Sequence, residues 1–399
     1  MRTPVKKGLA IFCIVLIALG AFLAGYYLKK EKIIKEELPT VPSILLVTYP
    51  PDDLKVSESL ESITVKGMTF GESVEVNENK VPILNGTFTA TVALKPGTNT
   101  IRVKAVKGAR VDETGITVTR LSYPITVYDD LGRKTTVKER PQGIVSIAPS
   151  CTEILFALGL GDKVVGVTTY CDYPPEATTK EKVGGYATVN IEKVVSLQPD
   201  LVLATGGLQK KFVENLATLN ITTIALYPHT LDEVLQNIRL VGLVTNTSHY
   251  AEILVQNLET RIYNITSKTS VLTDDKKVSI YYEMWCGPYY TAGPGTFVND
   301  LIIKSGGMNI GGTATTEWPT LTEEFIITSN PQVIITTKMN DPVGGTPEAI
   351  KNRTGWNVIE AVKHDRVYLV DGNLFERPGP RLVDGLELLA KLLHPGLFT

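Results

Sequence analysis

The sequence predicts an α/β protein of two doubly wound α/β lobes, joined by one long helix and preceded by a small β-sandwich. Three observations lead to this prediction. Short apolar runs such as 144–148 alternate with amphipathic segments, which is typical of parallel strands connected by helices. Residues 44–122 follow a period of two instead, with Gly or Pro turns between the strands. A single apolar stripe along 248–267 predicts one long helix between the lobes.

The composition is that of an ordinary globular protein. Of 399 residues, 43% are hydrophobic and 21% are charged, and the formal net charge is −2. A chain of this length can hold two or three domains, and its charge gives no electrostatic attraction to nucleic acid. The four cysteines are too few for a disulfide scaffold and form no C-x-x-C pair, so we predict no structural zinc site. A single disulfide between Cys151 and Cys171 stays open.

The N-terminus predicts a membrane anchor. After a basic end at residues 1–7, residues 8–28 are apolar and uncharged, which matches the ~20 residues that span a bilayer. The run ends near two tyrosines and offers a poor cleavage site, so we expect an uncleaved transmembrane segment rather than a removed signal peptide. The basic charge at the end favours a cytoplasmic N-terminus, with the following domains on the extracytoplasmic side. Residues 29–43 form a linker.

Residues 44–122 predict a small antiparallel β-sandwich. The segments 62–67, 73–77, 86–92 and 99–105 alternate apolar and polar side chains and are separated by turn residues. This region resembles bacterial and archaeal Ig-like spacer domains. It contains no pattern of catalytic residues, so we interpret it as a spacer between the membrane and the lobes.

The first lobe is predicted over residues 123–247 and begins with a hairpin. Its strand at 144–148 leads into a helix, where Ser150 and Glu153 match a capping box. In that motif the serine side chain accepts from a helix amide, and the glutamate reaches back to the serine amide.

Two loops of this lobe follow neighbouring predicted strands, at 149–152 and 168–175. Ligands bind outside the carboxyl ends of strands in open α/β sheets, and both loops emerge at such ends. The second loop carries Tyr170 and Tyr173 beside two prolines, which is an unusual composition for a simple connection. We therefore expect ligand contacts in both loops.

The run ThrTyrCysAspTyrProProGluAla at 169–177 resembles the iron-siderophore and cobalamin class of ABC-transporter substrate-binding proteins, periplasmic binding protein class III. It looks most like the cobalamin-binding branch, and the resemblance extends from about Tyr123 to the C-terminus. It implies two lobes, 123–247 and 271–399, on either side of an inter-lobe helix at 248–270. It also implies a solute receptor without cofactor, resident metal or catalytic residues, which works with a permease and its ATPase.

Two acidic residues occupy equivalent positions in the two lobes. In Asn190-Ile-Glu192 and Thr322-Glu-Glu324, a helix-capping residue is followed two residues later by Glu and nine residues later by Pro. Acidic residues are favoured near helix N-termini by ~0.3–1 kcal/mol for structural reasons alone. In the family that the chain resembles, such matched glutamates dock onto arginines of the permease. The resemblance therefore implies permease docking through Glu192 and Glu324.

The resemblance also implies ligand contacts. Tyr170 stands at a position like a tyrosine of the family's cleft, and Tyr186 stands where cobalamin binders tend to have tryptophan. Trp318 stands at a matching tryptophan, and residues 373–381 resemble the family's late cleft loop. Trp285 has no clear counterpart in the family. The candidate ligand contacts are Ser150, Cys151, Tyr170, Tyr186, Trp285, Trp318, Phe375 and Arg377.

The predicted ligand is a corrinoid such as cobalamin. A corrinoid is large, flat and amphipathic, so it needs aromatic walls and hydrogen bonds rather than a charged clamp. Arg377 and Arg381 are the only basic candidates, and Arg377 could equally be held by Glu376 or Asp371. This favours a neutral ligand, while a ferric siderophore or haem stays open.

An enzyme is not predicted. The four histidines are scattered without the spacing of a metal site, and no nucleophile or phosphate-binding motif is present. A bilobal metal chelatase or hydrolase would need a clustered set of acid, base or metal-binding residues, which we cannot assemble. A surface adhesion or assembly protein would be compatible with the anchor but would leave the aromatic loops unexplained.

Overall fold

The structure is a computed structural model that describes residues 43–338 and 345–398. The basic end and the membrane anchor predicted within 1–28 lie outside these residues, as does nearly all of the predicted linker. Among the described residues, no helix is both long and apolar enough to cross a membrane.

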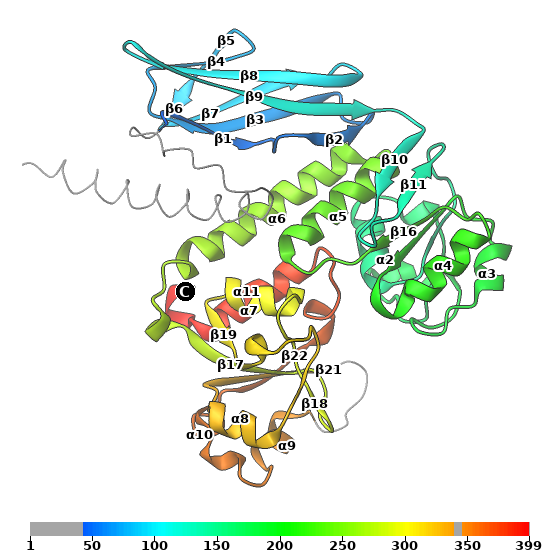
Figure 1. Ribbon diagram of the computed structural model, residues 1–399, viewed down its shortest axis with the longest axis vertical. Helices are drawn as coiled ribbons and strands as arrows, with labels where there is room; N and C mark the ends of the chain where they lie inside the picture. The colour runs from blue at the N-terminus through cyan, green and yellow to red at the C-terminus, as the bar shows by residue number, and fades with distance from the viewer. Residues whose placement is uncertain (1–42, 339–344, 399) are drawn as a thin grey trace, which may run out of the picture. The chain divides into compact units, whose positions relative to one another are not determined.

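The residues from 45 to 121 form two β-sheets, which Figure 1 shows as two layers in blue and cyan. The first has the order β1 (Leu45–Tyr49), β3 (Ser62–Thr69), β7 (Thr87–Ala93), β6 (Ile83–Leu84). The second has the order β2 (Leu54–Ser57), β9 (Arg110–Leu121), β8 (Gly97–Lys107), β4 (Ser73–Val76), β5 (Asn79–Val81). Alternate side chains along β8, those of Ile101, Val103 and Ala105, are buried, which matches the period of two in the sequence.

The first lobe contains a five-stranded parallel sheet in the order β14-β13-β12-β15-β16. The strands are β12 (Ile144–Ser146), β13 (Val164–Val167), β14 (Glu181–Lys182), β15 (Leu201–Thr205) and β16 (Thr223–Leu226). Two helices pack on one face, α2 (Pro149–Ala157) and α5 (Leu231–Val244), and two on the other, α3 (Ile191–Ser196) and α4 (Lys210–Thr218). The central strands are thus covered on both faces, which is why they are continuous apolar runs in the sequence. A hairpin of β10 (Ile125–Tyr128) and β11 (Lys134–Val137) precedes the sheet.

The capping box predicted at Ser150 and Glu153 is wrong. Helix α2 begins at Pro149, its N-cap residue is Ala148, and no side chain caps it. The physical reason is that Glu153 has other partners: its carboxylate is buried, with 3% of the residue exposed, and accepts hydrogen bonds from Arg381.

One long helix, α6 (Ser248–Thr269), connects the two lobes. Leu258, Ile262 and Ile265 are buried along one side of it, so the predicted apolar stripe faces the core. The contacting core residues run from the first lobe through α6 into the second lobe. Because packed interiors resist deformation, this shared core restricts the lobes to small relative movements.

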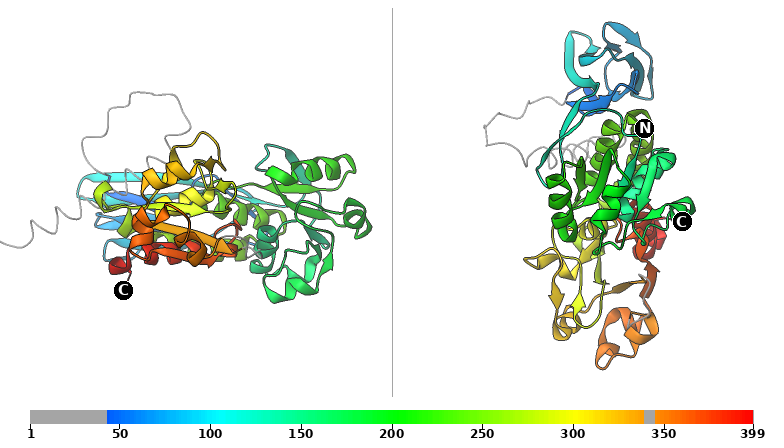
Figure 2. Two further views of the ribbon diagram at one scale, coloured as in Figure 1. Left: turned by 90° about the horizontal axis from the view of Figure 1, so that it is seen from below. Right: turned by 90° about the vertical axis from the view of Figure 1, so that its right-hand side faces the viewer.

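The second lobe contains a four-stranded parallel sheet in the order β19-β17-β21-β22. The strands are β17 (Val278–Glu283), β19 (Gly307–Asn309), β21 (Val333–Lys338) and β22 (Val367–Asp371). Helices α7 (Phe297–Lys304) and α11 (Leu382–Leu393) pack on the shared core, and α8 (Glu323–Ser329), α9 (Pro347–Lys351) and α10 (Glu360–Lys363) cover the other face. Two short strands, β18 (Tyr289–Tyr290) and β20 (Thr320–Leu321), pair with each other. Figures 1 and 2 show the first lobe in green and the second in yellow to red.

The two lobes repeat one arrangement of strands. β12 lies between β13 and β15, as β17 lies between β19 and β21. Helix α3 leads into β15 and α8 leads into β21, in each case through a residue with positive φ followed by proline. These residues are Gln198 (φ 48°) and Asn330 (φ 46°). The weak repeat seen in the sequence is therefore a repeat of backbone structure.

The β-sandwich belongs to the same compact unit as the lobes and is bonded to α6. The Tyr49 hydroxyl donates a hydrogen bond to Glu252 Oε2 at 2.7 Å, and both residues are buried. The amide of Ser57 donates to Ser248 Oγ at 2.8 Å, at the first residue of α6. Buried contacts of this kind fix the sandwich on the inter-lobe helix more firmly than the sequence interpretation of a simple spacer suggests.

Candidate functional site

Tyr170 and Tyr186 lie at the carboxyl ends of neighbouring strands in the first lobe. Tyr170 follows β13, and 52% of it is exposed. Tyr186 follows β14 and is partly buried, with its hydroxyl 3.0 Å from Thr205 Oγ1 at the end of β15. A hydrogen bond of 2.9 Å from Thr169 N to Gly184 O joins the two loops. The structure thus brings these two predicted contacts to one edge of the sheet.

Gln209 fixes the loop that carries Tyr186. Its buried side-chain amide donates to the backbone oxygen of Tyr186 at 2.9 Å and to that of Ile147 at 2.5 Å. Its oxygen accepts from the amide of Thr205 at 2.9 Å. Burial raises the pKa of the Tyr186 hydroxyl, which therefore stays neutral at physiological pH. Nothing in the residue pattern singled out Gln209.

The two predicted tryptophans of the second lobe differ in exposure. Trp285 follows β17, and 48% of it is exposed. Trp318 is partly buried and makes an edge contact with Phe297, with 6.2 Å between ring centroids. Among the predicted ligand contacts, each lobe therefore offers one open and one partly buried aromatic side chain.

Tyr227 and Glu317 form a contact between the lobes that the sequence interpretation missed. Tyr227 directly follows β16, and its hydroxyl donates to Glu317 Oε2 at 3.1 Å. Glu317 immediately precedes Trp318. His229 lies beside this contact, with Nδ1 2.7 Å from the backbone oxygen of Gly295 in the second lobe. The sequence did hold a signal for Tyr227: it directly follows an apolar run, and ligands bind at the carboxyl ends of strands in open α/β sheets.

Four of the predicted ligand contacts are buried: Ser150, Cys151, Phe375 and Arg377. Cys151 and Phe375 are 0% exposed, and Ser150 is buried in the first turn of α2. The Cys151 thiol donates to the backbone oxygen of Ala204 at 3.4 Å, and burial raises its pKa, so it stays protonated. Phe375 packs near Tyr282, with 6.4 Å between ring centroids. Because these side chains are enclosed by protein, we do not carry them into the proposed ligand site.

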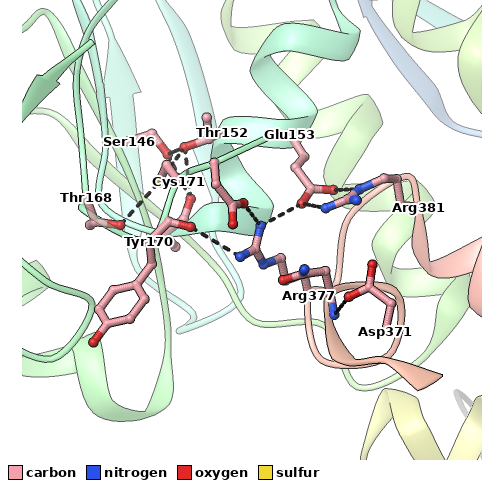
Figure 3. A network of polar contacts seen from close by, with 12 residues as sticks. Ser146, Thr152, Glu153, Thr168, Tyr170, Cys171, Asp371, Arg377 and Arg381 are labelled. Atoms are coloured by element: carbon pink, nitrogen blue, oxygen red, sulfur yellow. Dashed lines mark hydrogen bonds and ion pairs between the residues drawn. The ribbon is translucent and has the colours of Figure 1, made fainter. Parts of the chain in front are cut away.

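Cys151 and Cys171 are thiols and form no disulfide. The sulfur of Cys171 lies 3.1 Å from both Thr152 Oγ1 and Thr168 Oγ1. Figure 3 draws both contacts as dashed lines. Among the described residues, no group of three or more His, Cys, Asp or Glu side chains could hold a metal ion.

Arg377 lies within a network of ion pairs that also includes Arg381 (Figure 3). Arg377 is 7% exposed, and it donates from Nη1 to Asp172 Oδ1 at 2.6 Å and from Nη2 to the backbone oxygen of Tyr170 at 3.2 Å. Arg381 donates to both carboxylate oxygens of Glu153, at 2.9 and 2.6 Å. Arg377 and Arg381 of the second lobe are thus both paired with carboxylates of the first lobe.

The partners expected for Arg377 bond elsewhere. Glu376 accepts hydrogen bonds from Tyr282 and Thr337, and Asp371 accepts from the amide of Asn373. The true partners, Glu153 and Asp172, lie more than 200 positions away in the sequence, where no local pattern could reveal them.

Glu192 and Glu324 are the second residues of α3 and α8, and both are exposed. The side chains of Asn190 and Thr322 cap these helices, each accepting from the backbone amide three residues later. The equivalence expected from the spacing is therefore present in the structure.

Residues 144–374 match the model of a known family, described as periplasmic binding protein. This chain belongs to that family. The periplasmic binding protein region includes both sheets and α6, so the resemblance seen at 169–177 is confirmed at the level of the family.

Individual relatives are similar over about two thirds of the chain. An uncharacterized ABC transporter substrate-binding lipoprotein of Bacillus subtilis is 38% identical over 281 residues, which cover 69% of this chain and 87% of the relative. A cobalamin-binding protein of Halobacterium salinarum is 30% identical over 285 residues, or 68% of this chain and 75% of that protein. The crystal structure of a possible iron-binding (periplasmic solute-binding) protein from Staphylococcus epidermidis is 30% identical, with a TM-score of 0.56 over 64% of this chain and 100% of the other.

The family sets the general activity of this periplasmic binding protein. Its relatives are named as substrate-binding, cobalamin-binding or solute-binding proteins, and substrate-binding proteins of ABC transporters work with a permease and an ATPase. The chain is accordingly a substrate-binding protein of an ABC transporter.

Proposed function

We propose that this protein captures a corrinoid such as cobalamin between its two lobes and delivers it to an ABC permease. One observation carries the choice of ligand. Arg377 and Arg381, the basic candidates of the site, are already paired with Asp172 and Glu153. A guanidinium that is paired within the protein has little affinity left for the carboxylates or catecholates of an anionic chelate. A neutral ligand fits this arrangement better.

The proposed ligand contacts are the aromatic side chains at the strand ends: Tyr170 and Tyr186 in the first lobe, and Trp285 and Trp318 in the second. Their flat faces suit a corrin ring, and the tyrosine hydroxyls can bond to its amide side chains. Tyr227 joins this set, because it contacts the residue before Trp318. The cobalamin-binding relative from Halobacterium supports the corrinoid over other flat ligands.

Delivery to the permease would depend on Glu192 and Glu324. Each is an exposed carboxylate on the first turn of a helix, one in each lobe, and would pair with arginines of the permease. We propose in addition that residues 8–28 anchor the protein in the membrane, and that residues 44–122 are an Ig-like domain between the anchor and the lobes.

Calorimetric titration of the full chain, in detergent, tests the choice of ligand. We expect cyanocobalamin to bind at one site per chain with a Kd below about 1 μM, a binding free energy of about −8 kcal/mol. The second candidate is a ferric siderophore or haem, which the possible iron-binding relative from Staphylococcus favours. Binding of a ferric siderophore or haemin, without any response to cyanocobalamin, would select this candidate instead.

A further inference from the structure

Glu376 and Arg377 are neighbours in the chain, yet their side chains bond to different lobes. Glu376 Oε1 accepts from the Tyr282 hydroxyl at 3.1 Å and from Thr337 Oγ1 at 2.5 Å. These two residues belong to β17 and β21 of the second lobe. Arg377 donates to Asp172 of the first lobe at 2.6 Å. A movement of one lobe against the other therefore acts directly on this pair of residues.

The arginines hold the loop that carries Tyr170. Arg377 binds the backbone oxygen of Tyr170 and the carboxylate of Asp172, and the guanidinium of Arg381 lies 3.8 Å from the ring centroid of Tyr173. In Figure 3, the Tyr170 carbonyl points toward Arg377 and the ring points away from it. Arg377 thus holds the backbone of the loop and leaves the aromatic face open.

The charges of this network balance within a mostly buried group. Two guanidinium groups, of Arg377 and Arg381, meet two carboxylates, of Glu153 and Asp172. Arg377 is buried, whereas half of the Asp172 side chain is exposed, so water can solvate Asp172 when Arg377 withdraws. Their hydrogen bond of 2.6 Å is lost beyond about 3.5 Å, so a small separation of the lobes breaks the contact.

We propose that Arg377 is a positioning residue that couples the separation of the lobes to release of the ligand. When the second lobe moves away, Glu376 holds Arg377 to that lobe, and the guanidinium leaves the Tyr170 carbonyl and Asp172. The loop then loses its main tie to the second lobe, and the Tyr170 ring no longer has a fixed place against the ligand. The coupling rests on the proposed function only for the identity of the ligand.

Hydrogen exchange tests the coupling without any ligand. The variant Arg377→Lys keeps the charge but loses the forked geometry that binds two acceptors at once. Arg133→Lys is a matched control, because Arg133 also binds one carboxylate, that of Asp129, and one backbone oxygen, that of Thr223, but within the first lobe. We expect amides in the peptide 168–173 to exchange about tenfold faster in Arg377→Lys, and at the original rate in the control.

Asp172→Asn provides a second variant, because Asp172 is half exposed and its replacement leaves the core intact. We expect the same faster exchange in the peptide 168–173. Unchanged exchange in both Arg377→Lys and Asp172→Asn would overturn the coupling, whatever the ligand is.

A double-mutant cycle on ligand dissociation shows whether Arg377 acts through Tyr170. We expect Arg377→Lys to raise the dissociation rate of cyanocobalamin about tenfold in the wild-type background, and to have no further effect in Tyr170→Ala. An equal effect in both backgrounds would contradict the proposal. If the wild-type protein does not bind cyanocobalamin, the corrinoid proposal fails, while the exchange experiment still decides the role of Arg377.

Discussion

Glu192 and Glu324 occupy the same position in the two lobes, each as the second residue of a helix capped by the side chain two residues earlier. Both helices are followed by a residue with positive φ and then by a proline, Pro199 in the first lobe and Pro331 in the second. The equivalence thus extends over the whole helix and its exit.

Reversal of both charges tests the docking role. We expect Glu192→Arg combined with Glu324→Arg to abolish uptake of labelled cyanocobalamin by cells, because arginines on the permease would then meet like charge. The Kd of the purified protein should stay unchanged, since both residues lie outside the proposed ligand site.

A matched control reverses two other exposed helix glutamates, Glu214→Arg with Glu348→Arg, one in each lobe. This variant has the same net charge as the docking variant and should transport normally. Normal uptake by the Glu192 and Glu324 variant, or equal loss in the control, would rule out the docking role.

Trp318→Ala and Tyr186→Ala test the aromatic walls. Each removes a stacking face, and aromatic contacts of this kind contribute about 0.5–1.5 kcal/mol beyond the area that they bury, so the Kd for cyanocobalamin should rise about tenfold. Tyr186→Phe separates the ring from the hydroxyl, since it keeps the ring and loses the hydroxyl that bonds to Thr205. Equal affinity in the alanine variants and the wild type would remove these side chains from the ligand site.

The lowered pKa of Asp172 predicts that the protein loses stability at acidic pH. Partial burial raises the pKa of Asp172, but the hydrogen bond and the charge of Arg377 outweigh it and hold the pKa below its usual value. A carboxyl group with a lowered folded-state pKa stabilises the protein fully above its unfolded pKa, and this stabilisation is lost as the pH falls through the lowered value. We expect Asp172→Asn to lower the Tm at pH 7, and the difference from wild type to shrink once the pH falls below about 4. Thermal unfolding of both proteins between pH 7 and pH 3 measures this, and a constant difference across that range would contradict it.

Tyr49→Phe tests the attachment of the β-sandwich to α6. The change leaves the buried carboxylate of Glu252 without the tyrosine hydroxyl as donor, which should lower the free energy of unfolding by about 1–3 kcal/mol. Lys66→Met removes an exposed hydrogen bond between the β-sandwich and α6, from Lys66 to Gln256. This variant should change the free energy of unfolding by less than about 0.5 kcal/mol. Denaturant unfolding of the two variants compares them. Equal effects would mean that the buried bond adds nothing to the attachment.

Much of the fold could be predicted because its signals are local. In α6, β12 and β15, the spacing of apolar residues within each element shows which of its faces is buried. The equivalence of Glu192 and Glu324 was also visible, because the cap, the glutamate and the proline recur at the same spacing.

The candidate site could be predicted only in part, because its decisive contacts are distant in the sequence. Ser150 and Glu153 have the spacing of a capping box, but the ion pair of Glu153 with Arg381 across the lobes replaced the local bond. Phe375 lies in a loop that resembles the family's site, yet its ring points into the core. The ion pair of Glu153 and the burial of Phe375 depend on how the two lobes pack, which cannot be predicted from a local sequence pattern.

A crystal structure of the protein with cyanocobalamin would show whether a corrinoid binds between aromatic side chains of the two lobes. We expect one corrin ring within about 4 Å of both Tyr186 and Trp318, with the pair of Arg377 and Asp172 intact beside it. A ring bound on the β-sandwich, or against one lobe only, would contradict this expectation.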